Sequence, residues 1–198
     1  DILNRVQSQL RLVPTNGLLE SLRAIKEPEE IELITKAVEL TDSAFGYIKG
    51  VIHIGMSEKE AAWEIEKFLR EKGSETMPFD VIVASGPNSA LPHAKPSSRP
   101  ISSGEPIIID IGAKLGGYCS DLSRTICLGT PDDTCTKVYN AVLGAQLAAQ
   151  AIIAEGMTGA QADSLARTVI NEVGFGKAFG HGLGHGIGLA PHEQPRLG

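Results

Sequence analysis

Two aspartates, Asp110 and Asp121, are the side chains whose type and spacing point most directly to chemistry. The run of three isoleucines at 107–109 predicts a strand covered on both faces, and the residues around Asp121 predict a second strand running back. If the turn between the strands is centred on Leu115 and Gly116, the two aspartates lie directly opposite each other across the hairpin.

Opposed carboxylates of this kind need a compensating partner. Directly opposite side chains in an antiparallel pair have their Cβ atoms roughly 4.5 to 5.5 Å apart, and like charges there are destabilising. The carboxylates can share a proton, or one or two divalent cations can lie between them, as in two-metal hydrolases. The alternative is ordinary structure, with Asp110 near a turn and Asp121 paired with Arg124.

The histidines are concentrated in a glycine-rich segment near the end of the chain. Glycine occupies every even position of residues 180–188, so in an extended strand His181 and His185 share one face and the other face is bare backbone. With His192 just beyond, this pattern favours a metal and substrate site, and a mobile glycine-rich tail is the alternative. His93 lies in a loop rich in proline and glycine. Its side chain either has a functional role or is simply solvated.

Helical periodicity and capping patterns predict the elements that would position these side chains. Proline near the start of the first helix and a capping box at the start of the second mark where each begins. The predicted elements are helices at 28–50, 57–73, 132–154 and 158–173, and strands at 81–83, 107–109 and 118–128.

The second helix pair repeats the first at a constant offset of 101 residues, for example where Gly55 and Met56 correspond to Gly156 and Met157. Chance similarity is the alternative to a tandem repeat of two helix–helix–strand units. The repeat predicts an α+β fold, with two helix pairs on one face of a curved, mainly antiparallel sheet and pseudo-twofold symmetry. A second hairpin is then expected near positions 211 and 222, so we expect the chain to lack its last structural element.

Composition narrows the class of protein. The 198-residue chain is 42% hydrophobic, which suits a globular domain, and its net charge of −6 argues against nucleic acid or an anionic membrane as a partner. No apolar run approaches the roughly 20 residues of a membrane span, and no signal peptide opens the chain. Cys119, Cys127 and Cys135 lack zinc-ribbon spacing and are expected to be reduced, which favours the cytoplasm.

Three motifs occur together in the chain. Residues 90–95 read Ala-Leu-Pro-His-Ala-Lys, residues 109–125 run from Ile-Asp-Ile-Gly-Ala to Ser-Asp-Leu-Ser-Arg-Thr, and residues 180–193 run from Gly-His-Gly-Leu-Gly-His to His-Glu. Together they resemble the pita-bread metallopeptidase family, in its proline-specific branch of aminopeptidase P and prolidase. The resemblance covers residues 28–198 as the catalytic domain without its last segment, and residues 1–27 look like a remnant of an N-terminal domain and its linker.

The resemblance implies metal ligands in this chain. Asp110 would ligate one metal ion, Asp121 would bridge two, and His185 would ligate the other. The family's two remaining ligands are glutamates that follow the His-Glu motif, and the 198 residues do not include them. We therefore expect the chain as given to be inactive or weakly active.

The resemblance also implies a substrate pocket. His93, His181 and His192 would line it, contacting the scissile carbonyl or stabilising the tetrahedral intermediate. Alanine and proline at 190 and 191 depart from the family pattern at the rim of this pocket.

The implied reaction is metal-assisted hydrolysis of the Xaa-Pro bond in a proline-containing peptide. Two divalent cations would activate a water molecule and polarise the carbonyl, with manganese favoured by the oxygen-rich ligands and cobalt or zinc as alternatives. The expected partners are the peptide and a second copy in a homodimer, with no nucleic acid and no membrane. The alternatives are a methionine aminopeptidase-like enzyme, a metal-free creatinase-like enzyme, and a non-catalytic binding module with the same fold.

Overall fold

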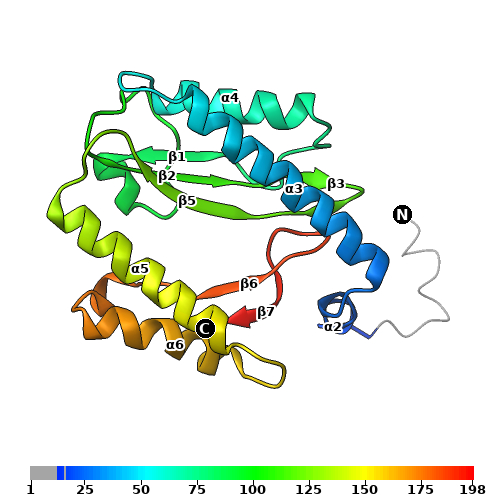
Figure 1. The fold of residues 1–198 in the computed structure, drawn as a ribbon. Helices are drawn as coiled ribbons and strands as arrows, with labels where there is room; N and C mark the ends of the chain where they lie inside the picture. Colours follow the sequence, from blue (N-terminus) through cyan, green and yellow to red (C-terminus); the bar gives the residue numbers. More distant parts are fainter. Residues whose placement is uncertain (1–12, 16) are drawn as a thin grey trace.

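The structure, a computed structural model, describes residues 13–15 and 17–198 and consists of two units of similar build (Figure 1). Part of the predicted N-terminal remnant, residues 1–12 and 16, lies outside the described residues. The first unit contains α3 (Pro28–Val51), α4 (Glu58–Glu71), β1 (Ile82–Ser85), η1 (Gly86–Ala90), β2 (Pro106–Ile111), β3 (Lys114–Leu115), β4 (Tyr118–Cys119) and β5 (Leu122–Cys127). The second contains α5 (Asp133–Ile152), α6 (Gly159–Glu172), η2 (Gly176–Ala178), β6 (Gly184–Gly186) and β7 (Glu193–Leu197), and α2 (Leu18–Ala24) precedes both.

The four predicted helices are present, and their ends follow the predicted capping signals. The Ser57 side chain accepts a hydrogen bond from the Glu60 backbone N–H, and the Glu60 side chain accepts one from the Ser57 N–H. Thr158 and Gln161 form the same reciprocal box at the start of α6. Because α4 and α6 are also equal in length and offset by 101 residues, the predicted repeat holds at the level of local structure.

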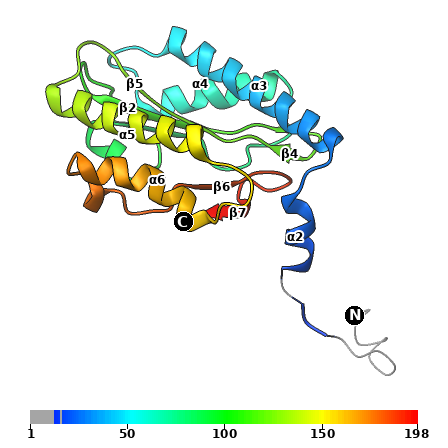
Figure 2. The same cartoon turned by 60° about the horizontal axis from the view of Figure 1, so that its bottom comes forward.

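In the first unit α3 and α4 cover one face of the antiparallel sheet β1-β2-β5 (Figures 1 and 2). Burial alternates along β2, with Ile107, Ile109 and Ile111 fully buried in the apolar core beneath the helices. Ile108 and Asp110 face the other way and are only partly buried. The prediction of a strand covered on both faces is therefore wrong within the described residues, and the uncovered face carries the aspartate.

The hairpin register also differs from the prediction. Gly116 and Gly117 form the turn, with φ of 56° and 84°, and two consecutive positive φ values suit the tight turn that joins antiparallel strands. The turn centre is one residue later than predicted, so Asp110 pairs with Ser123 and not with Asp121. Because the partner shifts by two residues, Asp121 stays on the same face as Asp110, displaced along the hairpin.

The predicted extended strand at 180–189 is present only as β6, which pairs with β7. The rest of that segment is irregular, because glycine at every second position gives little intrinsic preference for strand. Close approach of another backbone to the bare glycines is confirmed. A Cβ added at Gly182 would lie 2.8 Å from the Leu197 carbonyl oxygen, and one at Gly186 would lie 2.2 Å from that of Gln194.

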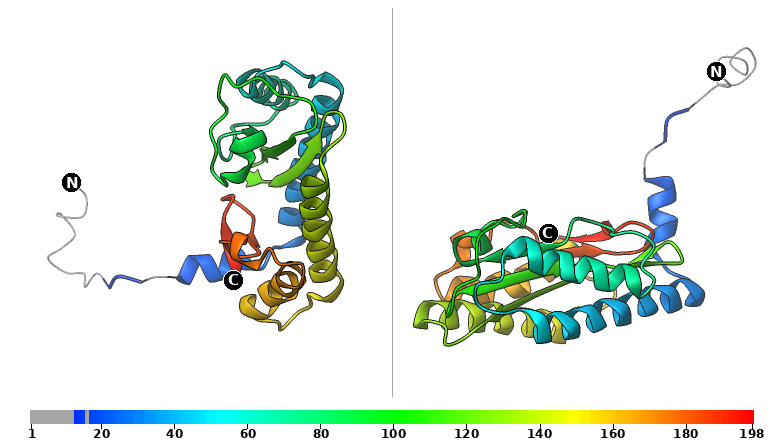
Figure 3. Two further views of the ribbon diagram at one scale, coloured as in Figure 1. Left: turned by 90° about the vertical axis from the view of Figure 1, so that its left-hand side faces the viewer. Right: turned by 90° about the horizontal axis from the view of Figure 1, so that it is seen from above.

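The two units have separate apolar clusters of unequal size. In the first, the larger cluster packs α3 and α4 against the sheet and uses residues between 40 and 128. In the second, α5 packs on α6 through small side chains, and the buried residues are Ala145, Ala149, Ala166 and Ile170. The long helices α3 and α5 lie on the same side of the molecule in Figure 3. No helix in the described ranges is long and apolar enough to cross a bilayer.

Candidate metal centre

Asp110 and Asp121 meet on the uncovered face of the hairpin. Asp110 lies on β2, where its Oδ1 accepts a hydrogen bond of 2.9 Å from the Ser123 hydroxyl. Asp121 lies in the irregular step between β4 and β5. Burial raises the pKa of both carboxyls, and the charge of Asp121 raises the pKa of Asp110 further. A cation between them would reverse this effect.

A buried hydroxyl network fixes the backbone beside Asp121. The Ala113 N–H donates to Ser120 Oγ over 2.9 Å, and the Ser120 N–H donates to the Ala113 carbonyl over 2.9 Å. Thr41 on α3 contacts the same Ser120 hydroxyl. Helix α3 therefore anchors the step in the hairpin that places the Asp121 carboxylate.

The glycine-rich segment brings His185 to the two aspartates, as predicted. Its Nε2 lies 3.6 Å from Oδ2 of Asp121. Its Nδ1 contacts the Gly186 carbonyl oxygen at 3.0 Å, and since a carbonyl only accepts, Nδ1 must be the donor. In the neutral ring, Nε2 then carries a lone pair toward Asp121, the arrangement of a histidine prepared for a metal ion. The His192 ring lies 4.2 Å from the His185 ring, centroid to centroid.

The other two predicted histidines are placed differently. His93 is exposed, and its charge is a minor influence that lowers the pKa of Asp110. The His181 ring packs edge-on against Phe179 with centroids 4.9 Å apart. Its charge acts on Asp163, and the described residues contain no contact between His181 and the aspartate pair.

Acidic residues that the sequence analysis missed hold the histidine segments in place. Asp163 on α6 accepts a hydrogen bond from the Leu183 backbone N–H over 2.9 Å and two from Arg167, one from Nε and one from Nη2. Arg167 in turn donates to the His181 carbonyl oxygen over 2.8 Å. Asp163 and Arg167 belong to no recognisable sequence motif. Only their contacts with the distant segment at 181–183 reveal that they hold it in place.

Glu193, predicted only as part of the His-Glu motif, is largely buried, and its carboxylate contacts other residues than the aspartate pair. Its carboxylate accepts a hydrogen bond from the Ala190 N–H over 3.0 Å and forms ion pairs with Arg23 and Lys26. Burial alone would raise the pKa of Glu193, but these contacts outweigh it and lower the pKa. The segment around α2 is thereby tied to the turn that carries His192.

Replacing Asp163 with asparagine should lower the free energy of unfolding by about 1.5 to 3 kcal/mol, the usual contribution of a hydrogen bond to a charged group. The amide oxygen can still accept from Leu183, so the loss falls on the bond to Arg167. Arg167 lowers the pKa of Asp163 below its ordinary 3.8. The difference between the two proteins should therefore be present above that pH and disappear as the pH falls below it.

Urea denaturation at neutral and acidic pH measures this difference. Asp42→Asn is the matched control, because Asp42 is an exposed aspartate on another helix. Equal destabilisation by the two substitutions would show that the Asp163–Arg167 pair contributes no more than a surface charge does.

The donor set fits part of a metal site. Two carboxylates and one imidazole are ligands that manganese, cobalt and zinc accept. Within the residues that the structure describes, no three His, Cys, Asp or Glu side chains come together as a complete set of ligands. The residues present can therefore start a hydrolytic metal centre but do not complete one.

The chain matches metallopeptidase family M24 over residues 32–198, which is most of its length. The chain belongs to this family. The matched range begins in α3 and includes the aspartate pair and every predicted histidine. Its α+β architecture, built from helix pairs and small antiparallel sheets, is the pita-bread fold of the solved M24 relatives.

Several M24 relatives are close in sequence and structure. An uncharacterized peptidase of Bacillus subtilis is 43% identical over 97% of this chain and 54% of its own length. A Xaa-Pro dipeptidase of Pyrococcus furiosus is 43% identical over 92% of this chain and 52% of its own. The structure of a Xaa-Pro dipeptidase from Bacillus anthracis superposes with a TM-score of 0.92 at 47% identity, covering 93% of this chain and 52% of that one. The chain thus spans about half the length of these relatives.

Proposed function

We propose that the protein is a metal-dependent peptidase that hydrolyses the Xaa-Pro bond, as aminopeptidase P or prolidase. The observation that carries the proposal is that Asp110 and Asp121 share the uncovered face of one hairpin and that His185 from β6 approaches Asp121 to 3.6 Å. Relatives described as Xaa-Pro dipeptidases support the substrate class. The part of the relatives that this chain does not span is expected to supply the remaining ligands.

Each residue has a proposed role. Asp110, Asp121 and His185 would hold the divalent cations, with manganese favoured over cobalt and zinc. The bound cations would activate water and polarise the scissile carbonyl. His192, beside His185, and His93 contact the substrate carbonyl, and His181 lines the pocket at a greater distance.

The setting of the enzyme is also proposed. Residues 28–198 form the larger part of the catalytic domain, and residues 1–27 lead into it from an N-terminal domain. Three free cysteines support a reducing compartment, the cytoplasm. A homodimer rests on the resemblance alone.

The whole encoded protein should hydrolyse Xaa-Pro dipeptides or longer Xaa-Pro peptides once manganese is added, and dialysis against a chelator should abolish this activity. The 198-residue chain alone should be slower by at least about 10² to 10⁴, the usual contribution of a general base, which is expected among the missing glutamates. Released amino acid is measured for both proteins with Xaa-Pro and Met-Gly substrates.

Preference for Met-Gly substrates would assign a methionine aminopeptidase-like activity instead. Metal binding without hydrolysis of either substrate by the whole protein would favour a non-catalytic module. Full activity of the 198-residue chain would show that the ligands are assigned incorrectly.

A further inference from the structure

The loop that follows β1 carries His93 but has no helix or strand to hold this side chain in place. It begins with the short 3-10 helix η1 and continues to Pro100, which forms an isolated bridge with Ser57 ahead of β2. The His93 imidazole forms no hydrogen bond with another described residue, and the residue is exposed. The position of the imidazole relative to Asp110 therefore depends on how the loop backbone is anchored.

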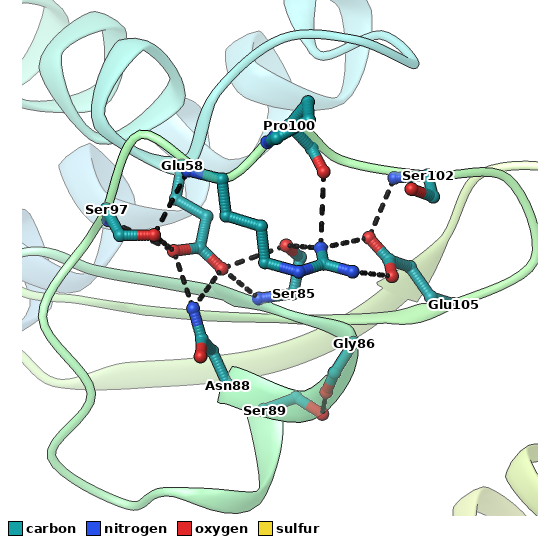
Figure 4. Close-up of polar contacts among 10 residues, drawn as sticks. Glu58, Ser85, Gly86, Asn88, Ser89, Ser97, Pro100, Ser102 and Glu105 are labelled. Carbon is teal, nitrogen blue, oxygen red and sulfur yellow. Dashed lines mark hydrogen bonds and ion pairs between the residues drawn. The ribbon is translucent and has the colours of Figure 1, made fainter.

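Both ends of this loop are bound by one carboxylate, that of Glu58 (Figure 4). At the start of the loop, Oε1 accepts hydrogen bonds from the Ser85 N–H over 2.7 Å and from the Ser85 hydroxyl over 2.9 Å. At its end, Oε2 accepts from the Ser97 N–H over 3.0 Å and from the Ser97 hydroxyl over 2.7 Å. The Asn88 amide donates to both oxygens over 3.0 Å.

Glu58 is fully buried. Burying a carboxylate is energetically costly unless its oxygens accept hydrogen bonds, so the network around Glu58 is needed to keep it there. Burial alone would raise its pKa, but the hydrogen bonds from Ser97 and Ser85 outweigh burial and hold the pKa below its ordinary value. The group is therefore a charged acceptor at neutral pH. Every group that hydrogen-bonds to the Glu58 carboxylate is a donor. Glutamine at this position would place its N–H₂ group, itself a donor, against some of these donors and lose their hydrogen bonds.

The other end of the network fixes Ser85 itself. Arg99 donates to the Ser85 hydroxyl over 2.6 Å and forms a two-pronged ion pair with Glu105 just before β2. The Glu58 backbone N–H donates to the Arg99 carbonyl oxygen over 3.1 Å. The N-terminal turn of α4, the His93 loop and the strand that carries Asp110 thus form one connected network.

We propose that Glu58 is the positioning residue for His93, holding the loop of residues 86–96 so that the imidazole keeps its position relative to the strand that carries Asp110. Glu58 touches neither substrate nor metal in this role and acts through the loop backbone. The expected effect of Glu58 on the reaction rate rests on the proposed function. Its expected effect on the loop rests only on the hydrogen-bond network.

The test is Glu58→Gln in the whole encoded protein, with Glu60→Gln as the matched control on the same helical turn. The control is mild because the second unit already has a glutamine, Gln161, at the equivalent capping position. Glu58→Gln should lower kcat/KM for a Xaa-Pro peptide about 10- to 100-fold, the range typical of residues that orient a functional side chain. Glu60→Gln should leave kcat/KM unchanged.

A double-mutant cycle with His93→Ala separates positioning from general destabilisation. If Glu58 acts through His93, Glu58→Gln should cause no further loss of activity in the His93→Ala background. Equal losses in both backgrounds would overturn the proposal. If Glu58→Gln fails to fold, Ser97→Ala is the milder variant, because it removes one donor and leaves the carboxylate in place.

Amide hydrogen exchange gives a readout that needs no activity. Glu58→Gln should speed exchange in residues 86–96 and leave α4 and β2 unchanged, and unchanged exchange in the loop would overturn the proposal. A wild-type protein that does not hydrolyse Xaa-Pro peptides would refute the proposed function, whereas the exchange experiment would still decide whether Glu58 holds the loop.

Discussion

Asp121→Asn in the whole encoded protein should nearly abolish Xaa-Pro hydrolysis. The loss in kcat/KM should exceed the roughly 10- to 100-fold typical of residues outside the ligand shell, because Asp121 is proposed to bind the cations directly. An amide also removes the charge that faces His185 at 3.6 Å. Bound manganese, measured by atomic emission after dialysis, should fall together with the rate.

Asp80→Asn is the control for this substitution, since Asp80 is exposed and precedes β1. It should change neither rate nor metal content. An Asp121→Asn protein that retains its metal and hydrolyses at the wild-type rate would remove Asp121 from the site.

Ile109→Ala should lower the free energy of unfolding by about 2 to 5 kcal/mol, the usual range when a large buried aliphatic side chain is cut back to alanine. Ile109 is fully buried on the helix-facing side of β2, so the cavity lies at the centre of the larger apolar cluster. Ile54→Ala is the control, because Ile54 is 55% exposed, and it should change stability by less than about 0.5 kcal/mol.

Urea denaturation followed by circular dichroism measures both variants. Similar midpoints for Ile109→Ala and Ile54→Ala would mean that the β2 core contributes less than its burial indicates. Asp110 is next in the chain but faces away from the cavity. The amount of manganese bound at saturation should therefore change little, although the stability falls.

Helix positions could be predicted because their signals are local. The boxes at Ser57 and Thr158 begin α4 and α6, and glycines with positive φ, Gly73 and Gly174, follow their ends. Each of these signals depends on side chains within four residues of the helix end. A repeat of local signals also made the two-unit organisation visible in the sequence.

The hairpin register could not be predicted, because several adjacent pairs in the turn could occupy its centre. Gly116 and Gly117 take that place, since both tolerate positive φ, whereas a turn centred on Leu115 would need positive φ at a leucine. The common face of Asp110 and Asp121 was nevertheless predicted correctly, because side chains alternate with a period of two.

The contacts that hold the histidine segments have no local signal. Glu58 lies 39 residues from Ser97, and Glu193 lies 170 residues from Arg23. A single sequence does not reveal which acidic residue turns inward to meet such distant donors. The candidate ligands could therefore be named in advance, but the residues that position them could not.

The unequal apolar clusters have a consequence for synthesis of the protein. Every residue of the larger cluster has left the ribosome once the chain beyond Leu128 emerges, so the first unit can form its core before the second is complete. The second unit, which buries mainly alanines, then meets a surface that is already formed. One point of attachment is the Cys119 N–H, which donates to the Gly188 carbonyl oxygen over 2.7 Å. The half of the proposed metal centre that the aspartates would form is thus assembled first, and the nascent chain brings His185 to it.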